Sequence, residues 1–150
     1  MTTQQTPYAD YDYAVDKYGE DYVLTSVTRD SKPDKKAFHK ALVNATSFID
    51  SHVAPRYPGV VPLSNPPDII RGYCVDIAIY QASADPGTHT EEKRSRFDDA
   101  VAWLEKVAAG KVAIMTLESD GSEVDAGDTD MPVMKASPRL FSRHKLRGLL

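Results

Sequence analysis

The stretch from Pro66 to Ala84 reads PPDIIRGYCVDIAIYQASA, and it constrains the fold of this chain more than any other part. Its apolar residues recur at intervals of three and four positions, which is the period of an α-helix. Further apolar residues widen this stripe, and a helix that is apolar nearly all round is normally covered by several neighbours. The stretch is too short and too often interrupted by charge to span a bilayer. We therefore predict the central helix of a small all-α domain over residues 66–84, with the paired prolines in its first turn.

Three further segments have the helical period and are predicted to pack around the central helix. They cover residues about 9–27, 34–54 and 89–109, and Gly19 interrupts the first of them as a helix C-cap does. The stripe of the second segment consists of Phe38, Ala41, Leu42, Ala45, Phe48, Ile49 and Val53. The fold class is therefore predicted as all-α, a bundle of four main helices of which the first is broken.

Side chains that can cap helices precede two of these segments. Asp30 or Ser31 is predicted to cap the helix that starts near residue 34, with Pro33 tolerated in its first turn. Thr88 and Glu91 have the spacing of a capping box, in which each side chain satisfies a backbone N–H group of the other. We therefore predict that Thr88 caps the last helix.

The composition of the chain narrows its class. A chain of 150 residues is expected to form one domain with a core large enough to fold without disulfide bonds or structural metal ions. The net charge of −4 provides no global positive field that would attract nucleic acid. The single cysteine, Cys74, excludes an intramolecular disulfide framework and fits a reducing compartment. No signal peptide is expected, because the first residues, MTTQQTPYADYDY, have neither a basic region nor an apolar run.

The two signs of charge are unevenly distributed along the chain. Residues 1–117 carry 16 acidic and 13 basic side chains, whereas residues 118–130 carry six acidic and no basic ones. Residues 131–150 then carry five basic and no acidic side chains. We therefore divide the chain into a helical domain, residues 1–110, and an extended arm, residues 111–150.

The arm begins with a segment that can form a β-strand. Residues 111–117 are β-capable, with Val112, Ile114 and Thr116 at alternate positions, and residues 131–136 could return as a second strand, which would give a β-hairpin within residues 111–136. A disordered linker is the alternative that the polar composition allows. A basic tail, residues 135–150, follows.

The chain offers no catalytic, cofactor-binding or metal-binding constellation. The four histidines, His39, His52, His89 and His144, lie on different predicted elements, and no two of them have metal-ligand spacing. Cys74 has no histidine or cysteine beside it, and its place in the central helix predicts a buried, inert thiol. No phosphate-binding loop, nucleophile elbow or EF-hand order occurs. We therefore expect a protein that is not an enzyme.

Asp76 is a carboxylate within the otherwise apolar central helix. Because an unpaired buried charge is costly, we expect Asp76 to form a structural ion pair. Arg56, just beyond the second long helix, is the predicted partner, with Arg71 and Arg96 as weaker candidates. A solvent-facing Asp76 is the alternative.

The C-terminal tail combines large apolar residues with cations, which is unusual for a chain end that frays. Such apolar groups would suit a groove, and the arginines would suit carboxylates or phosphates at its rim. The residues predicted to bind a partner protein are Arg139, Leu140, Phe141, Arg143, Lys145, Leu146, Arg147 and Leu149. A tail that folds back onto its own bundle is the alternative.

Several stretches, taken together and in order, resemble a known family. They are KYGED at 17–21, residues 41–57 ending in APRY, NPP at 65–67 leading to CVDIAIY at 74–80, RFDDAVAWL at 96–104, AGK at 109–111, FSR at 141–143 and LRGL at 146–149. The chain resembles the small head–tail connector, or head-completion, proteins of Mu-like tailed phages and prophages. The segment from Leu117 to Pro132 is longer and more acidic than this family's pattern.

The resemblance implies a non-enzymatic adaptor that forms a homo-oligomeric ring, expected to be a dodecamer, at the portal vertex. Such a ring would extend the DNA channel and join head to tail, with the portal protein and a tail-side neck or terminator protein as partners. DNA would pass through without specific binding, and neither a membrane nor a cofactor is expected to take part. The protein would reside in the neck of the virion, and in the host cytoplasm during assembly.

A small helical nucleic-acid-binding regulator, whose basic tail contacts phosphates, is the rival hypothesis. The acidic balance of the remaining chain argues against it, and no pair of helices shows a recognition helix with a basic face.

Overall fold

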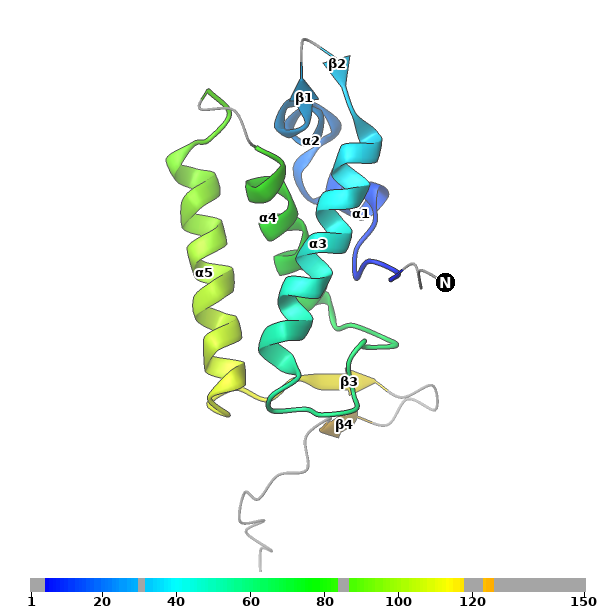
Figure 1. The fold of residues 1–150 in the computed structure, drawn as a ribbon, viewed down its shortest axis with the longest axis vertical. Helices are drawn as coiled ribbons and strands as arrows, with labels where there is room; N and C mark the ends of the chain where they lie inside the picture. Colours follow the sequence, from blue (N-terminus) through cyan, green and yellow to red (C-terminus); the bar gives the residue numbers. More distant parts are fainter. Residues whose placement is uncertain (1–4, 30–31, 84–86, 118–122, 126–150) are drawn as a thin grey trace, which may run out of the picture.

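The computed structural model describes residues 5–29, 32–83, 87–117 and 123–125, and this part of the chain is mostly helical. In Figure 1 the long helices lie side by side, the short helices pack beside them toward one end of the bundle, and a β-hairpin lies at the other end. The helices are α1 (Tyr11–Tyr18), α2 (Glu20–Ser26), α3 (Lys35–Val53), α4 (Asp68–Ala82) and α5 (Glu91–Ala108). None of the helices in the described residues is long and apolar enough to cross a membrane.

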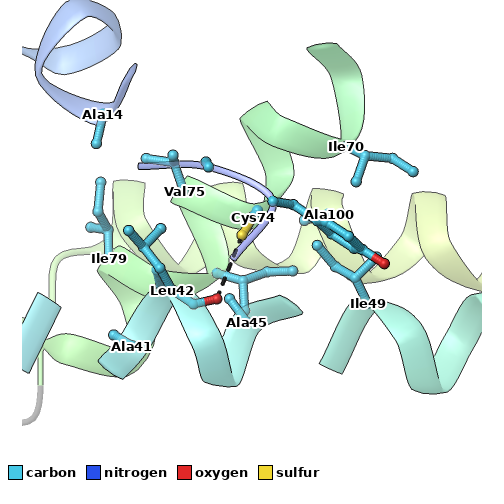
Figure 2. Close-up of a cluster of buried hydrophobic side chains, with 14 of the residues drawn as sticks. Ala14, Ala41, Leu42, Ala45, Ile49, Ile70, Cys74, Val75, Ile79 and Ala100 are labelled. Carbon is cyan, nitrogen blue, oxygen red and sulfur yellow. Dashed lines mark hydrogen bonds between the residues drawn. The ribbon is translucent and has the colours of Figure 1, made fainter. Parts of the chain in front are cut away.

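α4 is the central helix, as predicted. It packs against both α3 and α5, and eight of its fifteen residues are buried. Its side chains meet the apolar stripes of α3, where Leu42 and Ile49 are fully buried (Figure 2), and of α5, where Leu104 is fully buried. Each aliphatic side chain of this size contributes roughly 1.5–3 kcal/mol when it is removed from water. The apolar circumference of α4 is therefore what holds the other helices together.

Gly19 separates α1 from α2, which confirms the predicted break in the first helix. Its backbone N–H donates to the carbonyl oxygen of Val15 at 2.7 Å and closes α1. Its φ angle of 85° lies in the left-handed region, which costs a glycine little because it has no Cβ. Glu20 then starts α2 in a new direction, so that the two short helices form a bent unit across α3 and α4.

The cap of α3 differs from the prediction. Asp34, and neither Asp30 nor Ser31, is the N-cap, and its carboxylate accepts from the backbone N–H groups two and three residues further on. Pro33 lies outside the helix, in a short strand. Asp34 takes the role because it is the last side chain that can accept these hydrogen bonds before the apolar stripe begins. Residues 30 and 31 lie outside the described part of the chain.

The starts of α5 and α4 also differ from the prediction by a few residues. Thr90, and not Thr88, caps α5, and its hydroxyl accepts from the backbone N–H of Lys93. The capping box is therefore absent, because Glu91 falls at the first helical position instead of the third. Pro67 is the N-cap of α4, so the paired prolines precede the first turn of that helix.

Two short antiparallel hairpins complete the described structure. β1 (Thr28–Arg29) pairs with β2 (Lys32–Pro33) next to the start of α3. β3 (Met115–Leu117) pairs with β4 (Glu123–Asp125) at the opposite end of the bundle (Figure 1).

The β3–β4 pair confirms a hairpin in the arm but changes its second strand. The predicted return at residues 131–136 lies outside the described residues, and β4 is the strand that pairs with β3. The five residues between β3 and β4 are an ordinary length for a hairpin connection, whereas a return at residue 131 would require a much longer one. The shorter connection costs less chain entropy to close.

Candidate functional site

Asp76 forms the centre of a polar cluster between α1 and α4. Its side chain is 9% exposed, and the ammonium group of Lys17 lies 3.2 Å from both carboxylate oxygens. The hydroxyl of Tyr18 also donates to this carboxylate. Burial and this hydrogen bond to an anion raise the pKa of the Tyr18 hydroxyl above its usual range. The prediction that Asp76 is buried in an ion pair is correct, but its partner is Lys17 and not Arg56.

The shape of α4 explains why Lys17 can reach Asp76. Lys17 also donates to the backbone carbonyl of Gly72 at 3.2 Å, one turn earlier in α4. A Cβ atom on Gly72 would lie only 3.3 Å from the lysine nitrogen, which is tighter than most such contacts. The missing side chain at Gly72 therefore leaves the space through which Lys17 approaches the carboxylate.

The three arginines that the sequence suggested as partners lie elsewhere. Arg56 packs beside Gly110, with its Nε atom 3.5 Å from the position that a Cβ would take there. Arg71 pairs with Asp68 at 3.5 Å, on the exposed start of α4. The guanidinium of Arg96 lies 4.4 Å from the ring centroid of Tyr18, so Arg96 borders the cluster without bonding directly to Asp76.

Replacing Asp76 by alanine is expected to lower the free energy of unfolding by about 2–3 kcal/mol, because Lys17 and Tyr18 would lose their common acceptor. Urea unfolding followed by circular dichroism measures this change. Asp68→Ala is the matched control, since the side chain of Asp68 is 86% exposed and its ion pair is expected to contribute no more than about 1 kcal/mol. Equal losses for the two variants would contradict a structural role for the buried pair.

Cys74 lies in the core beside Thr46. Its sulfur is 3.5 Å from the threonine hydroxyl oxygen and 3.8 Å from the carbonyl oxygen of Leu42. Burial raises the pKa of the Cys74 thiol to about 11, so the thiol stays protonated at neutral pH. Because the thiolate is the reactive form, the structure agrees with the predicted inert core residue.

The described histidines lie in different parts of the fold and do not form a common site. His39 is exposed on α3, His52 packs against the ring of Phe48, and His89 packs against the ring of Tyr80. In the part of the chain that the structure describes, no group of three or more His, Cys, Asp or Glu residues could hold a metal ion. His144 lies outside the described residues.

A groove of about 820 Å³ runs between the N-terminal segment and the loop that precedes α4. Tyr8 fixes one wall, because its hydroxyl donates to Asp50 and accepts from the backbone N–H of Leu63 at 2.8 Å. Gln5 donates to the same carboxylate at 2.5 Å. The groove is lined by Gln5, Thr6, Pro7, Tyr8, Pro62, Leu63, Ser64, Asn65, Pro66 and Arg71. A concave surface with apolar walls and a few polar groups is the general form of a ligand-binding site.

Sequence reasoning missed this groove. Its walls come from residues 5–8 and 62–66, and their contact depends on a buried tyrosine hydroxyl that has partners in two other segments. The signal in the sequence was the aromatic Tyr8 among polar neighbours. The eight predicted partner-binding residues, from Arg139 to Leu149, lie outside the described residues, so their prediction remains untested.

Comparison with known proteins places the chain among phage proteins. The family model described as Bacteriophage Mu, Gp36 matches residues 8–133, which span the helical bundle and the β3–β4 hairpin. The chain is 31% identical over 131 residues to Gene product J of Escherichia phage Mu, with 87% of each chain covered. It is 28% identical over 117 residues to the Mu-like prophage FluMu protein gp36 of Haemophilus influenzae, with 78% of each chain covered.

Proposed function

Because the chain belongs to the bacteriophage Mu Gp36 family, we propose that it is a structural protein of a Mu-like phage that connects the head to the tail. In this role copies of the chain form a ring, expected to be a dodecamer, at the portal vertex. The ring extends the DNA channel between the portal protein and a tail-side neck or terminator protein. The protein acts by binding its neighbours and not by catalysis, and it is a component of the virion neck.

The observation that carries this proposal is the family match over residues 8–133. The structure supports it in two respects. The buried core lies between Tyr8 and Ile114, so the helical bundle folds around a core of its own and can serve as the body of a subunit. The β3–β4 hairpin lies at one end of that bundle, and the tail follows from there in sequence (Figure 1).

The tail provides the proposed contact with the portal protein or an adjacent subunit. Leu140, Phe141, Leu146 and Leu149 would enter a groove on the neighbour, and the cations between them would meet acidic groups at its rim. DNA is expected to slide through the ring without specific binding, since the net charge of −4 gives phosphates no strong attraction.

The proposal is tested by deleting the coding sequence from a Mu-like phage that carries this protein. Filled heads and complete tails are expected to accumulate separately, and supplying the intact chain from a plasmid should restore joined particles. Electron microscopy counts the joined and separate particles, and quantitative mass spectrometry of purified virions measures the copy number per particle. A normal yield of joined virions without the protein would refute the connector role.

A further inference from the structure

A small groove between α3 and the C-terminal end of α4 lies beside exposed lysines of α3. The groove measures about 270 Å³, and its lining comes from Val27, the first half of α3 and the last residues of α4. Small apolar residues and longer polar ones line it, among them Ala37, Ala41, Ala82, Lys40, Asn44 and Gln81. It can accept a short apolar side chain, with the ammonium group of Lys40 available beside it.

The lysines around this groove lack acidic partners among the described residues. Lys32, Lys36 and Lys40 are exposed, and Lys36 and Lys40 are one helical turn apart on the same face of α3. In the described part of the chain the salt bridges include Lys35, which pairs with Glu20, but none of these three lysines. We call Lys36 and Lys40 the basic surface of α3.

The position of this basic surface is not explained by the stability of the helix. Lys36 lies in the first turn of α3, where the helix dipole places partial positive charge and disfavours a cation. The N-cap Asp34 stands at this helix start, but its carboxylate accepts from backbone N–H groups and forms no ion pair with Lys36 among the described residues. A surface that carries unpaired positive charge at a helix start is well suited to a negatively charged partner.

The chain itself contains a segment with matching properties. Residues 118–130 carry six acidic and no basic side chains, with the small apolar residues Val124 and Ala126 among them. β4 forms part of this segment and lies at the far end of the bundle from the basic surface (Figure 1). The hairpin end is held there by Ile114, whose backbone N–H donates to the hydroxyl of Tyr57 at 3.1 Å, just beyond the end of α3.

The β4 strand and the basic surface of α3 lie toward opposite ends of the same protomer (Figure 1). Lys36 lies 17 residues before Val53 in α3, which is about 26 Å along the helix axis at 1.5 Å per residue. The five residues after Asp125 extend the acidic segment to Asp130, and they span at most about 18 Å. A second copy of the chain can supply this contact without bringing the two ends of one protomer together.

We propose that the acidic segment of one copy docks on the basic surface of α3 in the next copy, with a small apolar side chain in the adjoining groove. This inference rests on the self-association in the proposed function, and it names the surfaces that meet. Because they lie at opposite ends of the protomer, the contact is heterologous, as a ring requires. Duplex DNA is the competing occupant, but its phosphates would not fill the apolar part of the groove.

The test is a charge exchange between two variants. One variant carries Lys36→Glu and Lys40→Glu, and the other carries Asp128→Lys and Asp130→Lys. Each variant alone is expected to remain monomeric at concentrations at which the wild-type chain associates in low salt. An equimolar mixture is expected to associate again, because each variant then offers the surface that the other needs. Sedimentation velocity measures the distributions, and circular dichroism verifies that both variants are folded.

The matched control is Lys106→Glu with Lys111→Glu, which removes the same charge from exposed lysines elsewhere and should leave association unchanged. A mixture that stays monomeric, or a wild-type chain that never associates, would overturn the docking proposal. So would salt-sensitive binding of a DNA duplex that depends on Lys36 and Lys40 while association does not. If the protein is required in virions but the exchange fails, only the docking proposal falls. If the exchange succeeds but virions form normally without the protein, only the connector role falls.

Discussion

A chain cut after Met134 is expected to fold normally and to fail completely in joining heads to tails. The described core lies between Tyr8 and Ile114, and the shortened chain keeps all of it. They contain all eight residues that we propose to contact the portal protein or an adjacent subunit. A thermal melt followed by circular dichroism should match that of the full chain, and a phage that supplies only the shortened protein should yield separate heads and tails.

A second variant distinguishes loss of binding from mere loss of length. Phe141→Ala with Leu149→Ala keeps the tail and its cations but removes two of the apolar groups proposed to enter the neighbour's groove. We expect it to lower the yield of joined particles strongly. Joined particles at the normal yield from the shortened chain would show that the tail is dispensable and would leave the helical body as the binding element.

Ile70→Ala is expected to cost about 3 kcal/mol of folding free energy, the largest loss we expect from a single substitution. Ile70 is fully buried in α4, and removing three of its side-chain carbons leaves a cavity that the packed neighbours fill only in part. The adjacent Ile69 provides the matched control, because 47% of its surface is exposed. Ile69→Ala is expected to change the free energy of unfolding by only about 0.5 kcal/mol.

Urea unfolding of the two variants and the wild-type chain measures this difference directly. The slopes of the transitions should agree, since neither substitution changes the surface exposed on unfolding very much. Similar losses at the two adjacent positions would contradict the orientation of α4, and with it the central place of this helix in the bundle.

The helices could be predicted from the sequence because each carries a repeating apolar pattern, and these apolar side chains form the face that packs against the other helices. The helix predicted over residues 34–54 is observed as α3 (Lys35–Val53), and the break at Gly19 was visible because glycine is an ordinary helix stop. The helix starts were less predictable. Several residues able to cap stand close together before α3 and α5, and only the geometry of the first turn decides between Thr88 and Thr90.

The polar contacts were harder to predict than the helices. Lys17 and Asp76 are 59 residues apart, and their meeting depends on the direction of α1 and on the missing side chain of Gly72. The sequence showed that Asp76 needs a cation, but it did not show which cation the fold brings near. The groove beside Tyr8 was hidden for the same reason, because its walls come from distant segments.

The bond between Ile114 and Tyr57 determines where a pull on the arm enters the protein. Residues 111–114 leave the end of α5, but the buried backbone N–H of Ile114 is bound to the hydroxyl of Tyr57, in the loop that follows α3. Tension applied from beyond β3 would therefore load the junction of α3 with the core before it could peel α5 away. A neighbour that grips the arm would thus pull on the end of α3 as well as on α5, so the load would be shared between two helices that both pack on α4.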